Sequence, residues 1–246
     1  MRPDTSAIVA VHVYGSPCDV DALSAFAERK GLALIYDAAH AFGCRYRGRS
    51  LAAYGDAAAL SFHATKVYNT VEGGGVVVHD DTAFEILGFD LAHGHSQYEY
   101  RRVGLNAKNS EFHAAVGLLN LDDHAANVEA RRLIYEVYAD AFADGPARLL
   151  DPTRDRDLEY NYAYAPLLMA SEQLLGRVIE ALKTHQIFPR RYFRPALNTL
   201  PQFNGAAACP VAEDAADRLL CLPLYPTLAL RDAEFITRIV AECLPA

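Results

Sequence analysis

The chain has 246 residues, of which 52% are hydrophobic and 22% charged, a balance typical of a globular protein. Its formal net charge of −8 argues against a nucleic acid or an anionic membrane as the partner. No apolar run approaches the roughly 20 residues that span a bilayer, and the start of the chain lacks a signal-peptide pattern. The five scattered cysteines, odd in number and without zinc-site spacing, indicate reduced thiols in a cytoplasmic protein, and no metal site is expected.

The chain opens with a strand–helix–strand pattern. Residues 7–13 and 32–36 are short apolar runs rich in β-branched side chains, which is typical of buried strands. The helix between them is expected to begin after Asp19 and to end at Gly31. Strands joined by such a helix are parallel. Asp37, directly after the second strand, should therefore lie at the carboxyl edge of a parallel sheet, where open α/β sheets bind their ligands.

The remaining elements are predicted from apolar runs and helix caps, and they indicate two domains, residues 1–122 and residues 123–246. The first continues the mostly parallel sheet and the second is an α+β unit. Further strands are expected at 58–62, 76–79, 148–150, 161–169, 190–193 and 220–223. Further helices are expected at 81–87, 111–143 with a break near Asp122, 171–184, 211–219 and 231–243. Residues 88–108 and the polar stretch 151–159 are expected to be irregular.

The end of the predicted strand at 58–62 carries Ser61, and the polar loop that follows carries Thr65 and a single lysine, Lys66. A lone lysine in a loop is more often an ordinary surface residue. In mostly apolar surroundings, however, desolvation lowers the pKa of a lysine and makes its amine a usable nucleophile. A strand-end carboxylate, Asp37, and such a lysine suit pyridoxal phosphate (PLP). The carboxylate keeps the pyridinium nitrogen charged, the lysine forms the Schiff base, and the hydroxyls of Ser61 and Thr65 can bind the phosphate.

Three motifs of this region, DAAHAFG, SFHATK and EGGGVV, resemble the DegT/DnrJ/EryC1/StrS family of PLP-dependent nucleotide-sugar aminotransferases. The resemblance continues in family order through VHVYG, GLNAKNSEFHAAVGLLNLD, RRYFRPALNTLPQF and PVAEDAADRLLCLPLYP. It implies a fold type I aminotransferase, represented by part of the large domain and a C-terminal small domain. The implied reaction moves an amino group, from glutamate, onto a keto-sugar nucleotide. The motif variants are most similar to the branch that acts on dTDP-4-keto-6-deoxyglucose.

The resemblance also implies roles for individual residues. Lys66 matches the lysine that forms the Schiff base and then acts as the base, and Asp37 matches the partner of the pyridinium nitrogen. His40 stands where the family has Gln or His near the cofactor ring and its phenolic oxygen, and Ser61 resembles the phosphate-binding serine. Asn106 matches an asparagine that reaches the phosphate of the neighbouring subunit, which implies a homodimer with shared sites.

Four aromatic residues in these segments could have either a functional or a structural role. His12 and His63 either face the substrate or are satisfied histidines in a polar pocket. For Tyr192 and Phe193, core packing is favoured over substrate contact.

The sequence departs from the family pattern after Asn106. Lys108, Asn109 and His113 replace the usual arginine, methionine and glutamine. Lys108 keeps the charge but lacks the planar guanidinium, so a bidentate contact there is not expected.

A larger departure lies at the front, where the family has roughly a further hundred residues before the VHVYG strand. We expect an unpaired edge strand and exposed apolar faces there, and poor PLP retention and activity for the chain alone. The chain is then a fragment, one half of an enzyme completed by a separate N-terminal polypeptide, or a remnant. The alternative function is a non-catalytic dimerisation or regulatory module.

Overall fold

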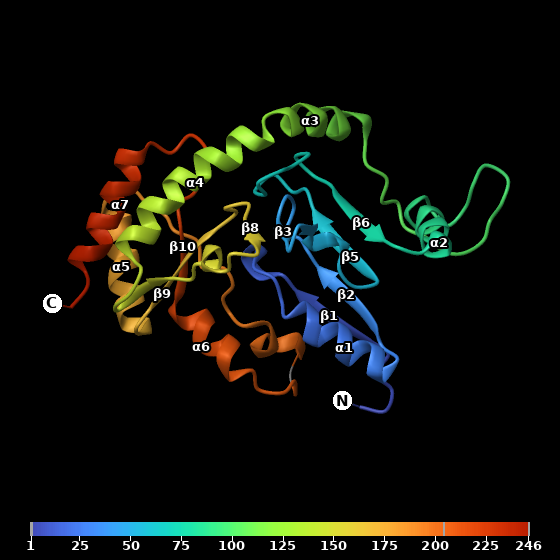
Figure 1. Cartoon of the computed structure of the whole chain (residues 1–246), viewed down its shortest axis with the longest axis horizontal. Coiled ribbons are helices and arrows are strands. Elements are labelled where there is room, and N and C mark those ends of the chain that lie inside the picture. The colour runs from blue at the N-terminus through green and yellow to red at the C-terminus, as the bar shows by residue number, and fades with distance from the viewer. Residues whose placement is uncertain (1, 204, 246) are drawn as a thin grey trace. The chain divides into compact units, whose positions relative to one another are not determined.

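The computed structural model describes residues 2–203 and 205–245, which form two compact units (Figure 1). The first unit contains the residues up to 125 together with residues 155–161. The second contains residues 126–154 and those from 162 onward. The chain therefore leaves the first unit, returns to it for seven residues, and leaves it again.

A four-stranded sheet in the order β1-β2-β5-β6 is the centre of the first unit (Figure 1). β1 (Ala7–Val11), β2 (Ala33–Asp37) and β5 (Ala57–Ser61) are parallel, and β6 (Gly74–Val78) is antiparallel to β5. The mostly parallel sheet predicted from the sequence is thus confirmed.

The helix α1 (Val20–Lys30) connects β1 to β2 and has the predicted ends. The side chain of Asp19 accepts a hydrogen bond from the Ala22 N–H, which satisfies a free donor of the first turn. Gly31 ends the helix in the left-handed conformation.

β1 is shorter than the predicted strand at 7–13. After Val11 the chain leaves the sheet in a 3-10 turn, η1 (Val13–Gly15), in which Tyr14 has a φ of 58°. β1 also lies at an edge of the sheet with Val9 and Val11 exposed, so the expected exposed edge strand is present.

A second, small sheet in the first unit was not predicted. It consists of β4 (Arg49–Ser50), β3 (Arg45–Tyr46) and β8 (Leu158–Glu159), all antiparallel. The turn η2 (Leu51–Ala53) follows β4. Two-residue strands are too short to show an alternating pattern, and β8 lies in the stretch that we expected to be irregular.

Three helices follow the sheet along the chain: α2 (Asp81–Leu91), α3 (Glu111–Asp122) and α4 (His124–Ala141). α2 runs beyond its predicted end at Leu87, since Phe89 and Leu91 continue the apolar pattern and Gly88 is tolerated inside the helix. The predicted break near Asp122 is confirmed, with Asp123 between α3 and α4.

The second unit is built on an antiparallel sheet in the order β10-β9-β7. Its strands are β7 (Ala147–Leu149), β9 (Ala165–Met169) and β10 (Leu219–Leu222), and its further helices are α5 (Glu172–Thr184), α6 (Pro210–Arg218) and α7 (Leu230–Glu242). Short 3-10 turns are η3 (Pro152–Arg154), η4 (Leu197–Thr199) and η5 (Pro201–Phe203). α5 buries one face, with Leu174, Leu175, Val178 and Leu182, and it packs against α7 and β9.

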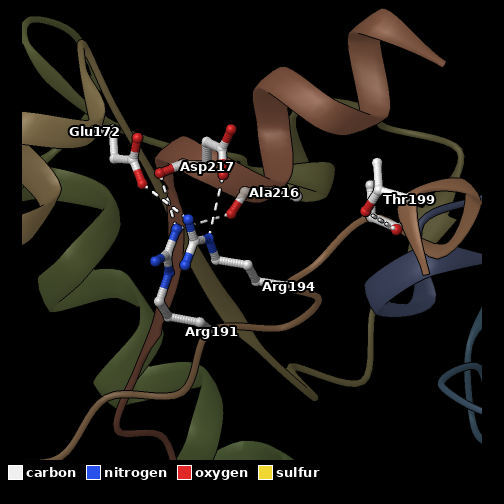
Figure 2. Close-up of polar contacts among 7 residues, drawn as sticks. Glu172, Arg191, Arg194, Thr199, Ala216 and Asp217 are labelled. Carbon is white, nitrogen blue, oxygen red and sulfur yellow. Dashed lines mark hydrogen bonds and ion pairs between the residues drawn. The ribbon is translucent and has the colours of Figure 1, made fainter. Parts of the chain in front are cut away.

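The strand predicted at 190–193 is wrong. Only one bridge, between Arg190 and Cys221, links this segment to β10. Figure 2 shows how side chains fasten it instead: Arg191 donates hydrogen bonds to the carbonyls of Ala216 and Asp217 near the end of α6, each at 2.9 Å. Arg194 pairs with the carboxylates of Asp217 and Glu172 (Figure 2). The segment thus satisfies open carbonyls of a helix end rather than extending a sheet.

Candidate functional site

Asp37 is the last residue of β2 and lies between two parallel neighbours, paired in register with Val11 of β1 and Ala59 of β5. It therefore stands at the carboxyl edge of the parallel strands, as the sequence predicted. Its Oδ1 accepts a hydrogen bond from the Ala39 N–H at 2.9 Å. This bond fixes the carboxylate in the turn that follows the strand.

Lys66 lies in the loop between β5 and β6. Two backbone hydrogen bonds of 2.9 Å, from Phe62 N–H to Gly73 O and from Thr70 N–H to Phe62 O, close this loop. Burial lowers the pKa of the Lys66 amine below its ordinary value, and the nearby charge of Asp37 opposes this shift only in part. The loop thus presents a half-buried amine, more easily deprotonated than that of a surface lysine, within electrostatic reach of a carboxylate.

Aromatic packing supports the Lys66 loop from inside the first unit. The rings of Phe42 and Tyr68 stack with their centroids 4.3 Å apart, and Phe62 meets Tyr68 edge to face. α3 approaches the loop at its buried Gly117, where a Cβ would lie only 2.7 Å from Thr70 Cγ2 and 2.9 Å from Tyr68 Oη. A glycine at this position lets the helix lie directly against the loop.

His40 follows β2 by three residues, and its Nδ1 accepts a hydrogen bond of 2.9 Å from the backbone N–H of Tyr14. Burial is the main cause that lowers the pKa of His40 to about 4; the charge of Lys66 lowers it further and that of Asp37 raises it. At neutral pH the ring is therefore uncharged. The structure thus brings together three of the predicted site residues: Asp37, His40 and Lys66.

The hydroxyl residues flank this group. Ser61 ends β5 shortly before Lys66, and its Oγ lies 3.4 Å from the His63 N–H that donates to it. The hydroxyl of Thr65 is 2.9 Å from Nδ1 of His63, and both side chains are exposed. His63 is thus a surface histidine that orders the loop, rather than one buried in a polar pocket.

Asn106 is not brought into this group within the chain. It is exposed and forms an isolated bridge with Ala92 at the end of α2. The role implied by the resemblance, in the site of a neighbouring subunit, stays a prediction.

His12 is structural in this chain. It is fully buried, stacks on Tyr36 with ring centroids 4.4 Å apart, and accepts a hydrogen bond at Nδ1 from the Cys18 N–H. The interpretation of His12 as a residue facing the substrate is therefore not supported. In the second unit, Tyr192 meets Tyr164 edge to face, whereas Phe193 is half exposed and does not fit the preferred interpretation of core packing.

Sequence reasoning missed two residues beside the site, Tyr160 and Asn161. They follow β8 in the segment that returns to the first unit. Asn161 is buried and donates hydrogen bonds to the carbonyls of His40 and Phe42. Asn161 was expected to begin the strand at 161–169, but that strand, β9, begins only at Ala165, so the pattern gave no signal for this placement. The role of the buried asparagine appears only once the β3–β8 pairing is known.

Comparison with known proteins decides the family. A family model described as the DegT/DnrJ/EryC1/StrS aminotransferase family matches residues 1–241. The chain belongs to this family. The resemblance noted in the sequence is confirmed, and the family is one of PLP-dependent aminotransferases.

Three relatives illustrate the range of the DegT/DnrJ/EryC1/StrS family around this chain. A dTDP-4-amino-4,6-dideoxy-D-glucose transaminase of Shigella dysenteriae is 34% identical over 98% of this chain and 67% of its own length. A GDP-perosamine synthase of Escherichia coli O157:H7 is 29% identical over 97% of this chain and 65% of its own. The crystal structure of DesI in the presence of its TDP-sugar product has a TM-score of 0.89 and 34% identity, covering 99% of this chain and 63% of DesI.

These matches confirm the fold type I aminotransferase architecture predicted from the sequence. The chain spans about two thirds of the length of the curated relatives that it matches. Within the described residues, no helix is long and apolar enough to cross a membrane.

Proposed function

We propose that this chain takes part in a PLP-dependent transamination that moves an amino group, from glutamate, onto a keto-sugar nucleotide such as dTDP-4-keto-6-deoxyglucose. The observation that supports this most directly is the grouping of Asp37, His40 and Lys66 at the carboxyl edge of the sheet. The names of two relatives point to the same substrate class, since one is a dTDP-amino-sugar transaminase and the other a GDP-perosamine synthase.

The residues present fit PLP. The partly desolvated Lys66 amine suits an aldehyde, the Asp37 carboxylate suits a protonated ring nitrogen, and the uncharged His40 ring suits a phenolic oxygen. When bound, PLP supplies an aldehyde and an aromatic ring that accepts electrons. These three side chains would hold the ring and its aldehyde.

Each residue has a defined task in this proposal. Nζ of Lys66 has a pKa lowered by burial, so it loses its proton more readily than a surface lysine and could later accept and return a proton at the substrate carbon. The carboxylate of Asp37, fixed by the Ala39 N–H, stabilises a positive charge in front of it. His40, whose Nδ1 already accepts from Tyr14, would donate from its Nε2 to the phenolic oxygen, and Ser61 at the end of β5 would donate from its hydroxyl to a phosphate oxygen.

Covalent labelling tests the central residue. Borohydride reduction of the chain with PLP, followed by peptide mapping, should place the label on Lys66. Lys66→Arg should lose the label and lower turnover by at least about a thousandfold, because arginine cannot act as the amine. Lys30→Arg, which changes an exposed lysine in the last turn of α1, is the matched control and should be labelled as the wild type is. A label on another lysine, with Lys66 unmodified, contradicts the proposal. The absence of any label at a saturating concentration of PLP, where weak retention no longer matters, favours the non-catalytic module.

A homodimer is part of the proposal, because α3 is apolar yet exposed. Phe112 is 85% exposed, and Leu118 and Leu119 are each 69% exposed. Apolar surface gathered on one helix is typical of an interface rather than of a free surface. A second copy of the chain over α3 would cover these side chains.

Sedimentation velocity tests this interface. The double substitution Leu118→Glu and Leu119→Glu should weaken dimerisation by at least about a hundredfold, because it places charges in an apolar contact. Val211→Glu is the control, since Val211 is equally apolar and 84% exposed but lies on α6. A wild-type chain that stays monomeric at high concentration, or a double variant that still dimerises, would contradict this part.

We place the protein in the cytoplasm, where a reducing environment keeps its five thiols free.

A further inference from the structure

The segment after β8 returns to the first unit and binds three backbone carbonyls around His40. The side-chain amide of Asn161 donates to the carbonyl of His40 at 2.9 Å and to that of Phe42 at 2.8 Å. The hydroxyl of Tyr160 donates to the carbonyl of Tyr14 at 2.8 Å. Asn161 is 2% exposed, so these bonds are shielded from water and their loss would leave buried acceptors without a donor.

Tyr160 and Asn161 also fix the two residues that form the hydrogen bond between Tyr14 and His40. Tyr160 holds Tyr14 and Asn161 holds His40, and the N–H of Tyr14 donates to Nδ1 of His40. A backbone N–H can only donate, so Nδ1 must be the unprotonated nitrogen of the ring. The neutral ring of His40 therefore has its proton on Nε2.

The turn that presents the Tyr14 N–H is held in an unusual conformation. Tyr14 has a φ of 58°, which non-glycine residues adopt only when their surroundings enforce it. The next residue, Gly15, has a φ of 84°, and a Cβ there would lie 3.1 Å from His40 O and 3.2 Å from Tyr160 Cε2. The ring of Tyr160 and the backbone of His40 thus pack directly on this turn.

The position of Tyr160 and Asn161 is set by the small sheet. β8 pairs with β3, with Glu159 opposite Arg45 and Leu158 opposite Tyr46. Because the register of this pairing is fixed, the next two residues reach the same place in every folded molecule.

We propose that Tyr160 and Asn161 are positioning residues that select the Nε2-protonated tautomer of His40. The role of this N–H toward a cofactor rests on the proposed function, but the tautomer itself does not. The hydrogen bond made at one ring nitrogen of a histidine commonly determines which nitrogen carries the proton, and therefore which nitrogen can donate to a ligand. Released from the Tyr14 N–H, His40 would populate both neutral tautomers.

The tautomer can be read directly in the full chain without cofactor. Long-range ¹H–¹⁵N correlation spectra of the protein labelled at histidine distinguish the two tautomers, and His40→Gln assigns the signal. We expect wild-type His40 to be protonated at Nε2 at neutral pH. In Tyr160→Phe and Asn161→Asp, the Nδ1-protonated form should increase at least about threefold, since each variant removes donors that hold the turn.

Two controls accompany this measurement. Tyr138→Phe removes a hydroxyl bond of the same kind in the second unit, from Tyr138 to the carbonyl of Pro223 at 2.9 Å, and should leave His40 unchanged. His12, which accepts from the Cys18 N–H, should keep its own tautomer in every variant.

The results that would overturn the proposal are distinct from a failure of the proposed function. A wild-type His40 protonated at Nδ1 would refute it. So would a wild-type tautomer in both variants, even if their melting temperatures fall, since the two residues would then serve stability alone. Tyr160→Phe removes a single oxygen and decides the matter if Asn161→Asp does not fold. Absence of PLP binding, with the tautomer shifting as expected, would refute only the proposed function.

Discussion

Gly117 offers a sharp test of how α3 supports the Lys66 loop. In Gly117→Ala the new methyl group would lie 2.7 Å from Thr70 Cγ2 and 2.9 Å from Tyr68 Oη. Carbon atoms in contact prefer a separation of about 3.5–4.0 Å, so one partner must move by about 1 Å. Thr70 cannot do so freely, because it is 3% exposed and its hydroxyl donates to the Glu72 carbonyl at 2.7 Å.

Two opposing effects set the magnitude. Replacing glycine by alanine inside a helix stabilises it by about 1 kcal/mol, whereas overpacking costs about 1–3 kcal/mol. We therefore expect Gly117→Ala to lower the free energy of unfolding of the first unit by about 1 kcal/mol, the difference of these effects. The matched control is Gly176→Ala in α5, where no atom lies within 4 Å of the new methyl group. It should stabilise the second unit by up to about 1 kcal/mol.

Native-state hydrogen exchange in urea measures both changes, since it reports the opening free energy of each unit separately. The two variants should change in opposite directions. If both alanines stabilise the protein, α3 does not press on the loop as the structure shows, and the argument for Gly117 fails.

Two further predictions concern pH and the second unit. Burial lowers the pKa of His12 from 6.5 to about 4. Between these pH values the His12 ring stays neutral in the folded state but binds a proton in the unfolded state. The stability that this burial allows above pH 6.5 is therefore lost as the pH falls toward 4. Between pH 7 and pH 5 the free energy of unfolding should fall by about 2 kcal/mol. Urea titrations should show that this free energy depends less steeply on pH in His12→Asn than in the wild type. An equally steep dependence would exclude His12 as the cause. Arg191→Leu should destabilise the second unit by about 1–3 kcal/mol, because it leaves two carbonyls of α6 without a donor. Arg194→Leu removes only partly exposed ion pairs and should cost less than about 1 kcal/mol, so equal losses in thermal unfolding would contradict the distinction.

Local signals made the core of the first unit predictable. Asp19 and Gly31 mark the ends of α1 through side-chain capping and a left-handed terminus, both of which depend on neighbouring residues alone. The parallel pairing of β1 with β2 follows from the helix between them. For the same reason, the place of Asp37 at the carboxyl edge of the sheet could be predicted from the order of the elements alone.

Long-range pairing was beyond sequence reasoning. Nothing near Leu158 or Glu159 indicates a strand, because both residues pair with β3 more than a hundred positions earlier. The wrongly predicted strand at 190–193 has a similar cause. The conformation of this segment depends on hydrogen bonds from Arg191 to carbonyls at the end of α6, which no local sequence pattern reveals. The burial of His12 likewise depends on Tyr36, a neighbour across the sheet.

The interleaved order of the two units has a consequence for how the chain acquires its structure. Residues 126–154 are an insertion of the second unit between two parts of the first, so the first unit cannot be completed from a continuous stretch of polypeptide. Pairing β8 with β3 closes a loop of about a hundred residues, which costs chain entropy. This pairing can form only after α3, α4 and β7, which lie between the two strands in the sequence, have been synthesised. During translation the small sheet and the turns at Tyr14 and His40 must therefore wait for a late segment to complete their contacts. A gene fragment that stops at residue 125 would encode the sheet but not that segment, whereas a circular permutant opened within residues 126–154 would keep both.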